Sequence, residues 1–380
     1  MLDVQSPMIP VVGEMVKRHP GTISLGQGVV RWGPPEVVAE AVGKAASSDP
    51  RVFKYSLAFG IDSILEAVRA KVENENHMKI DGGRRVAVTA GSNMGFVNAV
   101  LAVADVGDEV IILSPFYFNH EMAIEMAGCK AVVVETDEAY QPVVGAIDAA
   151  ITSRTRAVVT ISPNNPTGAV YRPEALEEIN RLCQKRGIYH IADEAYEYFV
   201  YGKNSHYSPG SRHGSEQHTI SLFSLSKAYG MAGWRVGYMV IPAHLEEAVK
   251  KVQDTNLICP PVIGQIAGEA ALSAGRSWCE EKIRGLSGVR EMVLGELAEL
   301  GDRVRVPDPG GAFYALMKVE TRMKDMEVVE KLIKEFGVAV MPGSTFGVQE
   351  GCYLRVAYGA LDRESVAEGM GRLVNGLQAI

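Results

Sequence analysis

The segment SLFSLSKAYGMAGWRVGY, Ser221–Tyr238, has the pattern of a strand, a glycine-rich loop and a second strand. The strands are predicted over the apolar runs Thr219–Phe223 and Val236–Ile241, and Lys227 lies in the loop between them. Two roles suit this lysine. It can be a solvated side chain beside a hairpin, or, among small residues, it can approach a bound carbonyl group and form a Schiff base.

An arginine stands eight residues after this lysine, at Arg235. A guanidinium group binds a phosphate through two parallel hydrogen bonds. A lysine for an aldehyde and an arginine for a phosphate together indicate pyridoxal phosphate as a ligand of the loop.

The chain before this segment alternates short apolar runs with amphipathic runs. This pattern predicts a mainly parallel sheet covered by helices on both faces. The apolar runs of strand length are Val86–Thr89, Val110–Leu113, Ala131–Glu135, Ala157–Ile161 and Ile188–Ala192. The helices between them are predicted near Met94–Val103, Asn119–Ala127, Val144–Ile151 and Pro173–Lys185. With the two strands around Lys227, we expect an α/β fold with a seven-stranded sheet, whose ligands bind at the carboxyl ends of the strands.

The remaining segments mix fewer strands with helices, which indicates a smaller α+β domain. Its strands are predicted at Ile23–Gly28, Arg303–Val306, Ala312–Met317, Val338–Met341 and Tyr353–Ala357. The other predicted helices are Met8–Lys17, Val37–Ala46, Ile61–Glu75, Ala243–Val252, Val262–Ala274, Trp278–Leu300, Glu327–Phe336 and Glu364–Leu377. We expect residues 1–43 to form an N-terminal arm and part of the small domain. Residues 44–276 then form the large cofactor-binding domain, and residues 277–380 complete the small one.

Polar residues follow several predicted strands. Gly91, Ser92 and Asn93 lie between a strand and a helix, where free backbone N–H groups and the helix dipole bind anions. Helix capping is the simpler explanation for Ser92 or Asn93. The sequence has neither G-x-x-x-x-G-K-[ST] nor G-x-G-x-x-G, which argues against a nucleotide-binding loop.

Three further strand ends carry candidate site residues. Tyr117 can stack on a flat heterocycle or pack in the core. Asn165, in the turn-forming run SPNNPTG, can donate its amide N–H to a phenolate oxygen, although the run also serves as a simple turn. Asp193 directly follows a buried strand, where a carboxylate is costly unless a cation pairs with it. A protonated pyridine nitrogen is such a cation, and the pairing keeps the ring an electron sink.

The motifs taken together resemble the class I/II aminotransferases, which are fold-type I pyridoxal-phosphate enzymes. The motifs that carry the resemblance are LGQG (25–28), KY (54–55), PNNPTG (163–168), DEAY (193–196), SLSK (224–227), GGAFY (310–314), MPGSTFG (341–347) and LRVAY (354–358). They stand in the family's order over nearly the whole chain. The resemblance implies a ping-pong transfer of an amino group between an L-amino acid and a 2-oxo acid.

The resemblance also implies a role for each motif residue. Lys227 would bind the cofactor aldehyde and then move the proton, Asp193 would pair with the pyridinium nitrogen, and Asn165 and Tyr196 would hydrogen-bond the ring hydroxyl oxygen. The residues expected at the cofactor phosphate are Gly91, Ser92, Asn93, Ser224, Arg235 and Tyr55 of the partner subunit. Tyr117 would stack on the cofactor, Arg355 would clamp the substrate α-carboxylate, and Gly28 would bring backbone close to the substrate. The shared position of Tyr55 implies a homodimer.

Within the family, the stretches SLGQGVVRWGPP, PFYFNHEM and AYEYFVY are most similar to plant-type aminotransferases of aromatic amino acids and methionine. This likeness implies a hydrophobic side-chain pocket lined by Trp32, Tyr117 and Tyr196. Arg31 supports an alternative, because an arginine there can bind the distal carboxylate of aspartate or glutamate.

Composition limits the other classes of function. The chain has 380 residues, 47% of them hydrophobic and 22% charged, as in soluble globular proteins, and its formal net charge of −8 argues against general nucleic-acid binding. Five scattered cysteines without C-x-x-C spacing predict neither a disulfide framework nor a zinc site, and they favour a cytoplasmic location. We expect no export signal and no membrane span.

Three related classes remain as alternatives. A pyridoxal-phosphate β-lyase would share the cofactor residues. A transcription regulator with an aminotransferase-like domain would need a basic DNA-binding segment before this fold, and the sequence shows none. A catalytically silent homologue would be expected to lack Lys227, Asp193 or Arg355, and all three are present.

Overall fold

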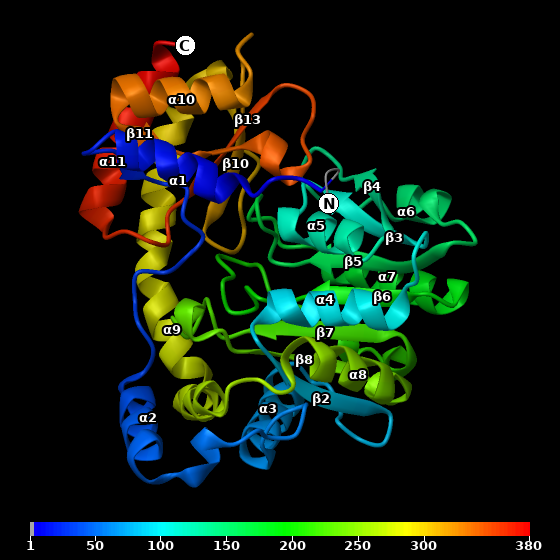
Figure 1. Cartoon of the computed structure of the whole chain (residues 1–380). Helices are drawn as coiled ribbons and strands as arrows, with labels where there is room; N and C mark the ends of the chain where they lie inside the picture. The colour runs from blue at the N-terminus through cyan, green and yellow to red at the C-terminus, as the bar shows by residue number, and fades with distance from the viewer. Residues whose placement is uncertain (1–3) are drawn as a thin grey trace.

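A seven-stranded sheet forms the centre of the computed structural model, which describes residues 4–380 (Figure 1). Its strands lie in the order β2-β8-β7-β6-β5-β3-β4, and β8 runs antiparallel to the other six. They are β2 (Arg84–Thr89), β3 (Glu109–Ser114), β4 (Lys130–Glu135), β5 (Thr155–Ile161), β6 (Tyr189–Asp193), β7 (Thr219–Ser224) and β8 (Gly237–Pro242). The predicted α/β fold with a mainly parallel seven-stranded sheet is confirmed.

Both faces of the sheet are buried, as β3 illustrates. Val110 and Ile112 pack in one apolar cluster with residues of α4, α5 and α8, whereas Ile111 and Leu113 pack in another with residues of α6 and α7. Because side chains alternate along a strand, a continuous apolar run fills both faces at once.

Helices surround this sheet and extend beyond it. They are α1 (Met8–Arg18), α2 (Glu36–Ser48), α3 (Asp62–Glu75), α4 (Ser92–Val103), α5 (Phe118–Met126), α6 (Val144–Ala150), α7 (Pro173–Arg186), α8 (Glu246–Leu257), α9 (Val262–Ala298), α10 (Asp325–Phe336) and α11 (Arg363–Gln378). Helix α9 packs on α2 and α3 near its start and on α11 farther along (Figure 1). Within residues 4–380, none of the helices is long and apolar enough to cross a membrane.

A smaller unit is built from both ends of the chain. Its four-stranded sheet has the order β12-β13-β10-β9, and a parallel pair joins β1 to β11 through Ile23 and Val338. The strands are β1 (Ile23–Ser24), β9 (Val304–Arg305), β10 (Tyr314–Val319), β11 (Val338–Ala339), β12 (Met341–Pro342) and β13 (Cys352–Ala357). Figure 1 shows α1, α10 and α11 gathered around these strands.

One segment differs from the expected element. The strand predicted over Ile23–Gly28 ends at Ser24, because the carbonyl groups that follow bind other partners: that of Leu25 accepts from the N–H of Ala357, that of Gly26 from Arg355, and that of Gly28 from Lys227. The two helices predicted at Val262–Ala274 and Trp278–Leu300 are present, because α9 (Val262–Ala298) consists of two helical parts that meet at a non-helical residue, Gly275 (φ 74°, ψ 178°). The domain boundary expected at 276/277 falls beside this interruption and stays a prediction.

Candidate active site

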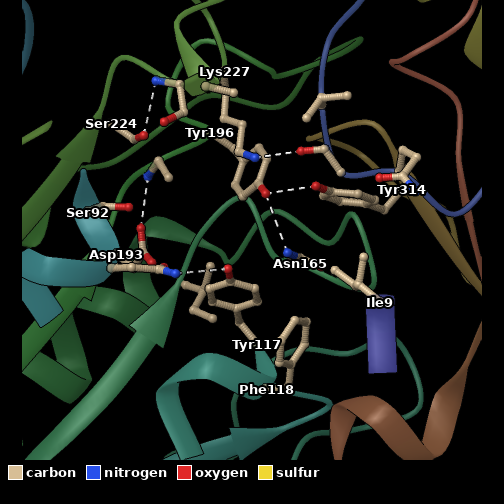
Figure 2. Close-up of a pocket in the computed structure, with 18 of the residues that line it drawn as sticks. Ile9, Ser92, Tyr117, Phe118, Asn165, Asp193, Tyr196, Ser224, Lys227 and Tyr314 are labelled. Atoms are coloured by element: carbon tan, nitrogen blue, oxygen red, sulfur yellow. Dashed lines mark hydrogen bonds between the residues drawn. The ribbon is translucent and has the colours of Figure 1, made fainter. Parts of the chain in front are cut away.

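A cavity of about 270 Å³ opens where the carboxyl ends of the central strands face the smaller unit (Figure 2). The predicted site residues that line it are Gly28, Ser92, Asn93, Tyr117, Asn165, Asp193, Tyr196, Ser224, Lys227, Arg235 and Arg355. The lining residues that were not predicted are Ile9, Gln27, Val29, Phe118, Ile161, Ala195, Ser226, Ala232 and Tyr314. Residues predicted from motifs scattered over most of the chain therefore meet in one cavity.

Lys227 supplies the reactive amine of this cavity. Its Nζ donates to the carbonyl of Gly28 at 2.6 Å (Figure 2). Burial, together with the positive charges of Arg355 and Arg235, lowers the pKa of the amine from 10.5 to about 8, against the opposing effect of Asp193. A neutral amine is the nucleophilic form, so an appreciable fraction of Lys227 is reactive near neutral pH.

One end of the cavity is suited to an anion. The first residues of α4, Ser92 and Asn93, lie there with Ser224, Ser226 and Arg235. Helix N-termini, hydroxyl groups and a guanidinium group are all donors to phosphate oxygens. Ser226 was not assigned a role from sequence, although it stands within the SLSK motif.

Gly91 is needed at this end for a steric reason. Its φ is 82°, a backbone conformation that favours glycine, and a Cβ atom there would collide with the guanidinium group of Arg235. Gly91 thus lets Arg235 approach the start of α4.

The cavity also contains a buried carboxylate. Asp193 is the last residue of β6, and its Oδ1 accepts from the backbone N–H of Ala195 at 3.1 Å. Its Oδ2 lies 3.1 Å from Nε2 of His120, whose ring stacks on Phe96 with 3.9 Å between centroids. Sequence reasoning missed His120. His120 lies on α5, three residues after Tyr117, and its ring contacts both Tyr117 and Asp193.

Tyr117 forms an aromatic wall beside this carboxylate. Its hydroxyl accepts from Nδ2 of Asn119 at 2.8 Å and from Nδ2 of Asn93 at 3.4 Å. Its ring meets those of Phe118 and His120 edge to face. These contacts hold the ring in place at the cavity.

Arg355 provides a buried cation on the side of the smaller unit. Only 1% of the residue is exposed, and its Nη1 donates to Oδ1 of Asn165 at 3.0 Å, while its Nη2 donates to the carbonyl of Gly26 at 2.7 Å. The rings of Tyr314 and Phe346 lie 4.6 and 4.7 Å from its guanidinium carbon. Its Nε has no protein partner, so the group retains a free donor for a carboxylate.

Three residues expected at the site lie elsewhere in the single chain. Arg31 is exposed, and Trp32 donates its Nε1 to the carbonyl of Ala228 at 3.0 Å and stacks on Phe199. Neither Arg31 nor Trp32 lines the 270 Å³ cavity. Tyr55 is 79% exposed and lines a separate hollow. The roles given to these three residues stay predictions.

Comparisons with known proteins show which family the chain is similar to. Residues 20–373 match the model of the family "Aminotransferase class I and II". The chain is 32% identical to aromatic aminotransferase ISS1 of Arabidopsis thaliana, covering 100% of this chain and 95% of that protein. It is 33% identical to an aspartate aminotransferase of Pyrococcus abyssi, covering 92% and 90%. The crystal structure of an aromatic aminotransferase from Pyrococcus horikoshii superposes with a TM-score of 0.88 at 32% identity, covering 97% of this chain and 99% of that one.

Proposed function

The chain belongs to the class I and II aminotransferase family, and on that basis we propose that its cavity binds pyridoxal 5'-phosphate and prefers aromatic or methionine-like amino acids as amino donors. The family is pyridoxal-phosphate-dependent, and its members transfer amino groups between amino acids and 2-oxo acids. The match therefore bears out the family resemblance and the aminotransferase function read from the motifs.

The residues present fit this cofactor. A phosphate group matches the donors of Ser92, Ser224 and Arg235, and a protonated ring nitrogen matches the buried carboxylate of Asp193 in the same cavity. The Lys227 amine lies in the same cavity and is available to the aldehyde. When bound, pyridoxal phosphate supplies an electron-withdrawing ring that makes the Cα–H bond of an amino acid acidic.

The protein's own groups then orient the substrate and move its proton. Arg355 and Asn165 bind the α-carboxylate, because the guanidinium Nε is free and the amide is already fixed by Arg355. Lys227, neutral in part because its pKa is about 8, takes the proton from Cα on its Nζ and can return it. Ile9 and Phe118 cover part of the cavity with apolar surface and reduce the access of water.

The observation that carries the substrate preference is the charge of the cavity lining. Among residues 4–380, the lysines and arginines that line it are Lys227, Arg235 and Arg355, and the proposal already gives each of them a partner. The remaining surface includes Ile9, Val29 and Phe118. A neutral, apolar side chain fits such a surface better than a second carboxylate, whose burial without a cation is costly.

A panel of amino donors tests this preference. We expect kcat/KM for phenylalanine, tyrosine and methionine to exceed that for aspartate and glutamate by at least about 10-fold, because specificity is expressed in that ratio. Arg31→Ala should leave all these values unchanged, as should a control at the exposed Arg18. A selective loss of aspartate turnover in Arg31→Ala would instead support the aspartate-type alternative. Release of pyruvate and ammonia without transamination would support the β-lyase alternative.

We also propose that the enzyme is a homodimer with shared active sites. Phe53, Tyr55 and Leu57 expose 79%, 79% and 74% of their surface on one short segment. Tyr55 and Leu57 line a hollow of about 520 Å³ together with Ile61 and Val262. Large apolar side chains gathered in this way mark a surface that another protein covers, and a second copy of the chain suits the family, which is typically dimeric.

Mixing two damaged variants tests whether the sites are shared. Tyr55→Ala and Lys227→Ala are each expected to have impaired sites, but a mixed dimer contains one site in which both native residues are present. Activity after joint refolding should therefore rise above that of either variant refolded alone. Two variants that never complement each other would contradict the shared site.

A cytoplasmic location is supported by the five free and buried cysteines.

A further inference from the structure

We propose that Tyr314 is a positioning residue that holds Arg355 with its ring and directs the hydroxyl proton of Tyr196 into the cavity with its own hydroxyl group. The proposal rests on the proposed function, because Tyr196 is expected to hydrogen-bond the ring oxygen of the cofactor. Tyr314 stands in the GGAFY motif at 310–314, to which sequence reasoning gave no role.

The place of Tyr314 in the fold is closely constrained. It is the first residue of β10 and pairs with Ala357 of β13, two residues after Arg355. The residue is fully buried. The backbone of Gly28 closes over its hydroxyl group, since a Cβ atom on Gly28 would lie 2.8 Å from the phenolic oxygen. The hydroxyl group is therefore held at one point, facing Tyr196 (Figure 2).

The hydroxyl groups of Tyr196 and Tyr314 share one hydrogen bond, and either of them could donate it. Their hydroxyl oxygens are 2.8 Å apart, and Nδ2 of Asn165 donates to Tyr196 at 3.4 Å. Asn165 is oriented by Arg355, which donates to its Oδ1. A hydroxyl group has one hydrogen and two lone pairs. If Tyr314 donates to Tyr196, then Tyr196 accepts twice and its own hydrogen stays available for a ligand in the cavity.

The partners of the two hydroxyl groups favour that direction. Within residues 4–380, the Tyr314 hydroxyl has one hydrogen-bond partner, the hydroxyl of Tyr196, and the backbone of Gly28 lies against it. A buried hydroxyl hydrogen without an acceptor is costly, so Tyr314 donates to Tyr196. Burial keeps both phenols protonated, because it raises the pKa of Tyr314 to about 12 and the pKa of Tyr196 well above its usual value of 10. A hydroxyl that accepts hydrogen bonds is polarised and becomes a stronger donor itself.

The ring of Tyr314 has a separate role, which is to hold the guanidinium group of Arg355. The guanidinium carbon of Arg355 lies 4.6 Å from the centroid of this ring and 4.7 Å from that of Phe346. Aromatic faces attract a cation, and two rings limit how far the guanidinium group can rotate. The ring thus prepares Arg355 for a carboxylate, while the hydroxyl prepares Tyr196, and substitutions can separate these effects.

Three variants test the proposed role of Tyr314. Tyr314→Phe removes only the hydroxyl group, and Tyr314→Leu removes the aromatic face as well. Tyr358→Phe is the matched control, because Tyr358 is also fully buried, its hydroxyl has no partner, and its backbone N–H bonds to Phe313, next to Tyr314. Thermal unfolding of each protein shows whether the fold is kept. Tyr314→Phe tests the role of the hydroxyl group, and Tyr314→Leu tests the role of the ring.

Two measurements on cofactor-loaded protein are independent of turnover. The first is the pH at which its absorbance changes, because a donor to the cofactor oxygen favours the deprotonated form of the chromophore. The second is the Kd of 3-phenylpropionate, a carboxylate without an amino group. We expect Tyr314→Phe to raise the absorbance midpoint by about 0.5 pH unit, the scale of one hydrogen bond, and to change the Kd by less than about 2-fold. Tyr314→Leu should also weaken 3-phenylpropionate binding by about 3- to 10-fold.

The outcomes separate this inference from the function on which it rests. The expected pattern, with Tyr358→Phe like wild type, supports the role of Tyr314. A midpoint in Tyr314→Phe equal to that of wild type, or an equal shift in Tyr358→Phe, overturns it while leaving the proposed cofactor in place. A wild-type protein that takes up no pyridoxal phosphate overturns the proposed function and this inference together.

Discussion

Lys227→Ala is expected to lower kcat by about 10⁴-fold or more, because a single side chain supplies both the covalent attachment and the proton transfer. The variant should still bind pyridoxal phosphate, since the anion end and Asp193 do not depend on the lysine. The lost contact to the structure is small: Lys227 donates one hydrogen bond, to the carbonyl of Gly28. Loss of activity without loss of the fold is therefore the expected combination.

Borohydride reduction followed by peptide mass analysis measures the covalent attachment directly. Wild-type protein should yield an adduct on residue 227, and the variant none. Lys227→Arg is a useful second variant, because arginine keeps the positive charge but has no deprotonated form near neutral pH. Normal turnover in either variant would show that another residue carries the reaction.

Asp193→Asn is expected to lower kcat by about 10²- to 10³-fold and to weaken cofactor binding, because an amide lacks the charge that stabilises a protonated ring nitrogen. The substitution preserves size, and the side-chain oxygen can still accept from the N–H of Ala195. A large effect would therefore come from the lost charge and not from a cavity in the core.

The adjacent residue offers a matched control. Glu194 is also buried, but its Oε2 accepts from His206 and Ser208 and it does not line the cavity. Glu194→Gln should keep kcat within about 3-fold of wild type, as is typical of changes outside the reacting groups. Cofactor affinity from equilibrium titration and kcat from steady-state assays make the comparison. Equal losses in both variants would mean that Asp193 acts only through the packing of the loop.

The parts of the site that could be predicted are those attached to the ends of buried strands. Asp193 and Lys227 follow apolar runs, and parallel strands bring their carboxyl ends to one edge of a sheet whatever the details of packing. The family motifs then identified site residues in the smaller unit, such as Arg355. Six of the seven strands of the central sheet were recognised for the same reason, since strands buried on both faces are almost entirely apolar. The edge strand β4 was recognised from its apolar run, although most of its residues are not buried.

The residues that sequence reasoning missed reach the site through contacts distant in the chain. Ile9 lies on α1 and lines a cavity whose lysine is residue 227, and no local pattern marks that approach. Tyr314 and His120 act through neighbours, Tyr196 and Asp193, so their sequence context gives no separate signal. Trp32 was expected in the pocket. Its indole donates to the backbone carbonyl of Ala228, and its role in the pocket stays a prediction.

The pairing of β1 with β11 has a consequence for synthesis on the ribosome. Ile23 is translated more than three hundred residues before its strand partner Val338. The central sheet, whose strands lie between Arg84 and Pro242, can assemble while the chain is still growing. The segment that carries β1 therefore stays without its strand partner until Val338 has been synthesised.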